Sequence, residues 1–251
     1  MAWSKSMIEA HEGATGLLNK IKDEAFDLMR TSSKISELDV KKFIVQRMED
    51  YQLISGSPQE LIVSFGKHTS NPHYTPSRNS SKSLVEGDLV MLDIWARLKN
   101  KNSPYGDITW MAYCGEKVPQ EILSVFDSVV VARDESLKIM ELILAGYQLP
   151  RGDQIEAIGQ GILFKRGLEK YVIHSLGHAI GVYSPHGMPR GEIGGIDCFN
   201  GNKLIPNLGY TIEPGVYFKG KFGVRSEIDF FIDEDYKLNV TTKVQKNIVK
   251  V

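Results

Sequence analysis

The sequence predicts an α+β fold in which helices cover the outer face of a curved antiparallel sheet. Two helical segments precede a group of strand-like segments, and the same order occurs again further along the 251 residues. The helical segments are long and periodic, whereas the strand-like segments are short, rich in β-branched and aromatic residues, and bounded by Gly, Pro, Asn and Ser. This repetition indicates two halves related by a pseudo-twofold.

The first half should begin with two helices. In residues 7–30, one apolar stripe recurs at steps of three and four, formed by Ala14, Leu18, Ile21, Ala25 and Leu28. A second helix should begin after Ser36, because Ser36 and Asp39 have the spacing of an N-capping pair. Strands are expected after it at residues 61–65, 88–96 and 107–114.

The second half repeats this order. A long helix is expected from Pro119 to about Ala145, with Gly146 as its stop. Asp153 can cap a further helix. Strands should then follow at residues 171–176, 210–218 and 223–232.

Composition and charge exclude several classes of function. Hydrophobic residues make up 42% of the chain and charged residues 24%, as in ordinary folded, soluble domains. The formal net charge is −1, so no overall field attracts nucleic acid or an anionic membrane. No signal peptide or long apolar run occurs, and two cysteines are too few for a disulfide scaffold. We therefore expect a cytoplasmic protein.

Four carboxylates lie in segments that should be strands. Asp93 lies within LVMLDIWA and Asp107 begins the next strand, so a hairpin would place them side by side. Glu213 and Glu227 have the same relation in the last two strands. Each acid taken singly could cap a strand, pair with a lysine or face solvent. Four acids together in a core would need cations, and divalent metals bound by oxygen ligands would neutralise them.

Histidines strengthen the metal hypothesis. In HSLGH, His174 and His178 are four residues apart and share one face if the segment is extended. Either one could also be an ordinary buried histidine. One neutral imidazole beside the acids would complete an asymmetric centre for two metals. His73 lies in a separate polar stretch, residues 68–83, which could also be a plain linker.

Together these motifs resemble a known family. The segments GDLVMLDIW, YGDITW, HSLGHAIG, YTIEPGVY and GVRSEID are similar to those of the pita-bread metallopeptidases, which include methionine aminopeptidase, prolidase and aminopeptidase P. The resemblance covers roughly residues 7–250. It implies the pita-bread fold and a single catalytic domain over residues 1–251, without the separate N-terminal domain of the creatinase type that relatives commonly carry.

The resemblance also implies a metal centre. It makes Asp93 a chelating ligand of one metal, makes Asp107 and Glu227 bridges between two metals, and gives the second metal to His178 and Glu213. The expected cofactors are two divalent ions, manganese or cobalt first, with zinc or iron as alternatives. In the family, a hydroxide shared by the metals attacks the scissile carbonyl, and Glu213 would shuttle the proton.

Further residues receive roles through the resemblance. His73 matches the histidine that assists the leaving nitrogen, and His186 would steady the oxyanion. His174 would line the substrate pocket. Arg225 belongs to the form of the last motif found in prolidase and aminopeptidase P, and it would hold a ligand carboxylate by a forked hydrogen bond.

The function expected from the resemblance is that of an Xaa-Pro aminopeptidase or prolidase, which cleaves the N-terminal bond of short peptides. Methionine aminopeptidase is the enzymatic alternative, and a catalytically inactive binding module of the same fold is the alternative from another class. The expected partner is a short peptide, with neither nucleic acid nor membrane, and a homodimer is one possible assembly.

Overall fold

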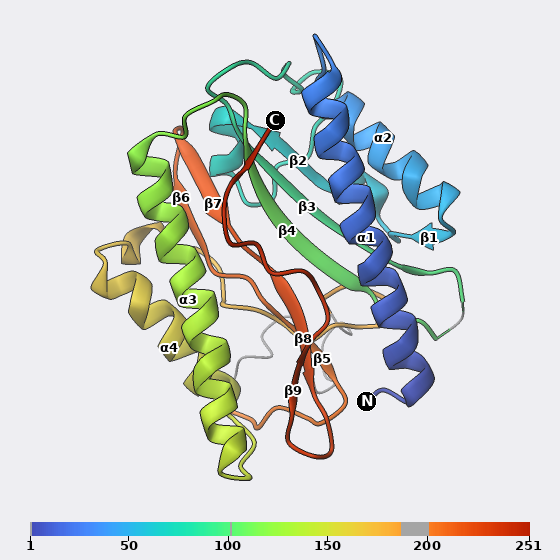
Figure 1. Ribbon diagram of the computed structural model, residues 1–251, viewed down its shortest axis with the longest axis vertical. Coiled ribbons are helices and arrows are strands. Elements are labelled where there is room, and N and C mark those ends of the chain that lie inside the picture. Colours follow the sequence, from blue (N-terminus) through green and yellow to red (C-terminus); the bar gives the residue numbers. More distant parts are fainter. Residues whose placement is uncertain (1, 101, 187–200) are drawn as a thin grey trace.

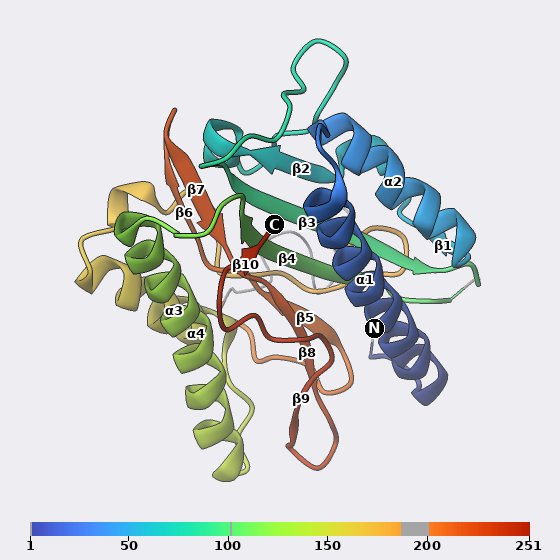
Figure 2. The ribbon, with the colours of Figure 1, turned by 45° about the horizontal axis from the view of Figure 1, so that its top comes forward.

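The chain folds into two α+β halves, as the order of elements predicts. The computed structural model describes residues 2–100, 102–186 and 201–251. In Figure 1, one helix pair lies on each side of the central strands, with the first pair in blue and the second in green and yellow. Figure 2 shows the same separation of the helix pairs from a second direction. The predicted α+β class is confirmed.

The helices of the first half begin where the capping residues predict. α1 (Lys5–Thr31) starts after Ser4, whose hydroxyl accepts a hydrogen bond from the Met7 amide at 3.3 Å. α2 (Glu37–Asp50) starts after Ser36, which forms a reciprocal capping box with Asp39. These caps satisfy amides that have no partner within the helix.

The first half contains the larger sheet, in which the strand order is β1-β3-β4-β10 and β2 also pairs with β3. The pairs are antiparallel except for β10 with β4, which is parallel. Two short 3-10 helices, η1 (Pro58–Glu60) and η2 (Gly66–Ser70), flank β2. The strands are β1 (Leu53–Ile54), β2 (Ile62–Phe65), β3 (Leu89–Leu98), β4 (Gly106–Tyr113) and β10 (Val249–Lys250).

The second half opens with α3 (Gln120–Ala145), which ends at Gly146 as predicted, and α4 (Gly152–Lys165). The predicted cap of α4 is wrong: Arg151 occupies the N-cap, and Asp153 lies in the first turn. There the Asp153 carboxylate pairs with the Arg151 guanidinium at 2.6 Å. An acid in the first turn still stabilises the positive end of the helix.

Each of the last two predicted strands is broken in the middle. Residues 210–218 divide at Glu213, and residues 223–232 divide at Glu227. Pro214 has no amide hydrogen to continue a ladder, which explains the first break. The resulting strands are β5 (Gly209–Ile212), β6 (Gly215–Phe218), β7 (Phe222–Arg225) and β8 (Ile228–Ile232), and β9 (Leu238–Val240) pairs with β8.

The strand predicted at residues 171–176 is wrong. A 3-10 turn, η3 (Glu169–Tyr171), is followed by irregular backbone. Pairing begins later, where the Glu213 amide donates to the Leu176 carbonyl at 2.7 Å and the Thr211 amide donates to the His178 carbonyl at 2.8 Å. The His178 amide donates instead to the Thr211 hydroxyl, at 3.0 Å, so the backbone hydrogen-bond ladder between these two segments is incomplete.

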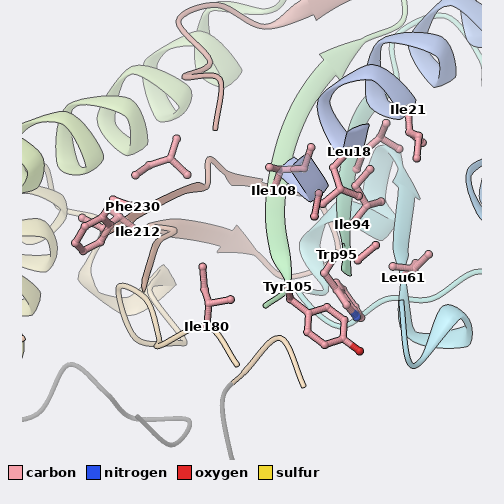
Figure 3. Close-up of a cluster of buried hydrophobic side chains, with 14 of the residues drawn as sticks. Leu18, Ile21, Leu61, Ile94, Trp95, Tyr105, Ile108, Ile180, Ile212 and Phe230 are labelled. Atoms are coloured by element: carbon pink, nitrogen blue, oxygen red, sulfur yellow. The ribbon is translucent and has the colours of Figure 1, made fainter. Parts of the chain in front are cut away.

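The larger of two hydrophobic clusters among the described residues joins the two halves. Figure 3 shows Leu18 and Ile21 of α1 beside Ile94 and Ile108 of the larger sheet. The same cluster continues to Ile180, Ile212 and Phe230 of the second half. Among the described helices, none combines the length and apolar character needed to cross a membrane.

Candidate metal centre

The two aspartates lie on one face of the β3–β4 hairpin. Asp93 is opposite Thr109 and Asp107 is opposite Trp95 in the register. Directly opposed residues share a face, so the two carboxylates are diagonal neighbours. Ile94 and Ile108 point to the other face, into the core. Asp93 and Asp107 are nevertheless only 6% and 3% exposed, so the fold buries two like charges together.

The two glutamates lie at the strand breaks, where the backbone leaves the regular pleat. Glu213 follows β5 and Glu227 precedes β8, and the β6–β7 hairpin between them pairs Gly215 with Arg225. This pairing brings both acids to the base of the hairpin. All four carboxylates line the same cavity, as the sequence predicts.

His178 presents one ring nitrogen to the acids. Its Nδ1 lies 3.0 Å from the Ala179 carbonyl, which can only accept, so Nδ1 carries the hydrogen. Nε2 therefore faces the acids, 3.2 Å from Glu213 Oε1 and 3.9 Å from Asp107 Oδ2. A bound cation would take the lone pair of Nε2 and replace the hydrogen that this nitrogen otherwise donates to Glu213. A backbone carbonyl that fixes the tautomer in this way is typical of a metal-binding histidine.

The donor set fits a divalent cation. Asp107, His178 and Glu227 each offer a ligand atom, and these atoms lie within 4.8 Å of one another. Asp107 Oδ1 is buried and has no hydrogen-bond partner among the described residues. Burial raises the pKa of Asp107 well above its usual value, and the charges of Glu227 and Asp93 raise it further. A cation would remove this repulsion, since oxygen and imidazole donors suit manganese, cobalt, zinc or iron.

Arg225 and Thr109 hold the carboxylates in place. The buried Arg225 guanidinium contacts Asp93 Oδ2 through Nη2 and donates from Nε to the Thr109 hydroxyl at 3.1 Å. Thr109 in turn donates to Glu227 Oε2 at 2.7 Å. Burial opposes ionisation of Glu213, but the hydrogen bond and charge of His178, together with Arg225, lower the pKa of Glu213 to about 2.

The remaining predicted histidines line a cavity of about 520 Å³ above the acids. The His186 ring centre lies 4.6 Å from that of His178, and His73 and His186 are both exposed at the rim. His174 is mostly buried: its Nδ1 donates to the Ser175 carbonyl at 2.8 Å, and its Nε2 accepts from the Tyr217 hydroxyl at 2.9 Å. Other wall residues are Ile62, Pro72, Thr75 and Trp95.

The sequence reasoning missed two residues that act at this site. Thr109 connects Arg225 to Glu227, as described above. Asp229 is fully buried, and its Oδ2 accepts the Asp107 amide hydrogen at 2.8 Å, which fixes the backbone of that residue. Thr109 lies two positions after Asp107 on the same face of β4, and Asp229 lies two positions after Glu227.

The two-half sheet, its helices and the buried donors are those of the pita-bread class. The chain belongs to metallopeptidase family M24, whose model matches residues 6–234, and the resemblance inferred from the motifs is thereby confirmed. The probable dipeptidase PepE of Mycobacterium tuberculosis (strain ATCC 25618 / H37Rv) is 30% identical over 194 residues, which are 75% of this chain and 46% of that protein. The chain thus spans about half the length of the curated relatives it matches.

Solved structures agree on the fold. The X-Pro aminopeptidase from Thermotoga maritima MSB8 superposes with a TM-score of 0.81 at 23% identity, over 100% of this chain and 64% of that chain. A recombinant prolidase from Thermococcus sibiricus gives a TM-score of 0.82 at 25% identity, over 100% of this chain and 62% of that chain. These likenesses confirm the predicted pita-bread fold.

Proposed function

We propose that the chain is the catalytic domain of an exopeptidase that uses two divalent metals and hydrolyses the N-terminal bond of short peptides. The observation that carries this proposal is the buried convergence of four carboxylates and the Nε2 of His178 at the base of one cavity. Asp93, Asp107, His178, Glu213 and Glu227 would hold the ions, and the resemblance assigns Asp107 and Glu227 to both of them. The single-domain organisation over residues 1–251 stays a prediction.

Each side chain around the cavity has its own role in the proposed hydrolysis. When bound, divalent ions supply a water of lowered pKa and polarise the scissile carbonyl. Glu213, which is ionised at neutral pH, accepts the proton of the attacking water and delivers it to the leaving nitrogen. His186 donates a hydrogen bond to the oxyanion, and His73 assists the leaving nitrogen. His174, which Tyr217 keeps in place, forms part of the pocket wall.

We further propose a preference for Xaa-Pro bonds. The support is the likeness to an X-Pro aminopeptidase and to prolidases, together with Arg225, which the resemblance assigns to that branch. The contact of Arg225 with Asp93 favours this branch over methionine aminopeptidase, whose last motif lacks the arginine.

The test is a panel of Xaa-Pro and Met-Ala peptides assayed with manganese and with cobalt, alongside metal analysis of the purified protein. We expect two equivalents of divalent ion and release of the N-terminal residue that a chelator stops. Asp107→Asn should lose both metal and turnover, whereas His73→Ala should keep metal and lose turnover. A protein that binds no divalent ion and cleaves no peptide would be the inactive binding module instead.

A further inference from the structure

Glu37 is a buried acid that lies outside the metal centre. It is in the first turn of α2 and is fully buried. Its Oε1 accepts hydrogen bonds from the Phe65 amide at 2.7 Å and from His68 Nδ1 at 2.8 Å. Its Oε2 accepts from the Tyr74 hydroxyl at 2.7 Å and from the Lys82 amide at 2.9 Å. One carboxylate therefore satisfies four donors, which offsets the cost of burying its charge.

All four donors belong to residues 65–82, the segment that carries His73. Phe65 and Lys82 are its two ends, and the Glu37 amide also donates to the Lys82 carbonyl at 3.1 Å. Glu37 therefore holds both ends of this segment, and its middle through Tyr74, against the start of α2. To stabilise the start of α2, Glu37 would need only its negative charge. That role does not explain why its carboxylate accepts four hydrogen bonds from residues 65–82.

Tyr74 transmits this restraint to its neighbour. Its ring stacks on the His68 ring with 4.3 Å between centroids, so both rings that donate to Glu37 pack on each other. His73, the residue before Tyr74, lines the cavity together with Pro72 and Thr75. The backbone amide of His73 donates to Asn71 Oδ1 at 3.1 Å, while its ring is exposed. The location of the His73 ring therefore depends mainly on where the backbone holds it.

The opposite side of the segment is attached to the second half. The Gly223 amide of β7 donates to the Thr69 hydroxyl at 2.9 Å, and the Gly220 amide donates to the Ser70 hydroxyl at 3.1 Å. A Cβ on Gly223 would lie 2.3 Å from the Thr69 carbonyl oxygen, so this contact is very close. The segment is thus fixed between α2 and the hairpin whose base carries Glu213.

We propose that Glu37 is a positioning residue, which holds His73 at the cavity through Tyr74 and the ends of the 65–82 segment. This inference rests on the proposed function, in which His73 acts on the substrate. It gives Glu37, which lies 36 positions before His73 in the chain, a part in the rate of hydrolysis but none in metal binding.

The experiment is a double-mutant cycle on the full chain with manganese and a peptide cleaved by the wild type. Glu37→Gln should lower kcat about 10- to 100-fold, because the amide group presents hydrogens to donors and the segment shifts. Manganese affinity, measured by titration calorimetry, should stay within about twofold. In the His73→Ala background, Glu37→Gln should cost no more than about twofold, because the group it positions is already absent.

Two further variants separate positioning from loss of stability. Tyr74→Phe keeps the ring stack and removes one donor, so it should lower kcat by a smaller factor and again have no effect in the His73→Ala background. Ser36→Ala removes the N-cap of α2 and leaves the Glu37 carboxylate contacts in place, so it should lower the melting temperature and keep kcat.

The outcomes distinguish this inference from the proposed function. If His73→Ala lowers kcat while Glu37→Gln and Tyr74→Phe keep the wild-type value, Glu37 is not a positioning residue. Equal losses from Glu37→Gln in both backgrounds would also overturn the inference, since they show action independent of His73. If Glu37→Gln does not fold, Tyr74→Phe decides alone by the same cycle. Full activity of His73→Ala would overturn the proposed role of His73, and the inference with it.

Discussion

At the scale of single residues, Arg225 connects three side chains of the site. Its guanidinium contacts Asp93, donates to Thr109 at 3.1 Å and lies 3.8 Å from Glu213. Burial works against its charge, but the surrounding acids raise the pKa of Arg225 well above its usual value. It is therefore a permanent cation that offsets part of the negative charge of the acids and orients the side-chain oxygens of Asp93, Thr109 and Glu213.

Arg225→Lys is the sharpest change at this position, because lysine keeps the charge and loses the planar fork. We expect a fall of about 10- to 100-fold in metal affinity or in kcat/KM, the usual effect of removing a partner that orients a ligand. Steady-state kinetics and manganese titration measure both. Arg166→Lys is the control, since the ion pair of Arg166 with Asp127 is exposed at the surface. Equal behaviour of the two variants would contradict the role given to the fork.

Which site residues could be identified from the sequence depended on how unusual each residue type is in a strand. An acid in an apolar strand is anomalous, so Asp93 and Glu227 could be singled out and their clustering anticipated. Threonine is common in strands, so nothing in the sequence singled out Thr109 as the connection between Arg225 and Glu227. Asp229 was not singled out because it lies in the same motif, GVRSEID, as Glu227, and Glu227 alone explained why that motif contains an acid.

At the scale of elements, the helices and the first hairpin could be predicted because their local patterns agree with the final fold. The two broken strands were predicted as continuous because both halves of each have ordinary strand composition. At the first break, Pro214 was the local signal against a continuous strand. The predicted strand at 171–176 failed for a related reason: His174 and Ser175 line the cavity, while the apolar residues around them pack on hydrophobic clusters or, at Ile173, face solvent. Local rules therefore failed mainly where backbone is diverted to present ligands.

The packing of α1 on β4 gives a prediction at this scale, using two glycines with opposite surroundings. A Cβ on Gly106 would lie 2.7 Å from Thr15 Cγ2 and 3.2 Å from the Thr15 amide nitrogen, so Gly106→Ala should force α1 away from β4. The expected cost is about 1–3 kcal/mol of unfolding free energy.

Gly16, in α1 itself, provides the control with open surroundings. Nothing lies within 4 Å of a Cβ built there, so Gly16→Ala should stabilise α1 by about 0.5–1 kcal/mol. Urea denaturation followed by circular dichroism measures both variants, with m unchanged. Stabilisation by Gly106→Ala would contradict the close packing.

At the scale of the whole molecule, the proposed ligands come from both halves. Asp93 and Asp107 belong to the first sheet, while His178, Glu213 and Glu227 belong to the second half. A metal bound there would connect the halves and cancel repulsion between the acids. With free manganese at 100 times its dissociation constant, the free energy of unfolding should rise by about 2.7 kcal/mol for one site.

Thermal unfolding with manganese or with a chelator checks this linkage. Asp107→Asn should remove most of the stabilisation by manganese, and Asp127→Asn, at an exposed surface pair, should keep it. The same rise in both variants would show that manganese stabilises the fold from elsewhere.

His11 connects distant parts of the chain and makes stability depend on pH. It is fully buried in α1, and its ring contacts the Tyr105 carbonyl and the Thr241 hydroxyl, each at 2.7 Å. Asp229 Oδ2 lies 3.9 Å from its Nε2. Burial lowers the pKa of His11 from 6.5 to about 4, although the hydrogen bond to Tyr105 opposes the shift. The folded state therefore keeps this imidazole neutral.

Between pH 6.5 and pH 4 the unfolded chain then binds more protons at residue 11 than the folded protein does. Stability from this group is complete above pH 6.5 and falls as the pH falls, by about 3 kcal/mol at pH 4. Other carboxylates titrate in the same range, so the quantity to measure is the difference between wild type and His11→Gln. Urea unfolding at pH 7, 6, 5 and 4 should show the advantage of the wild type shrinking by that amount. A difference that stays constant with pH would mean that His11 does not titrate on unfolding.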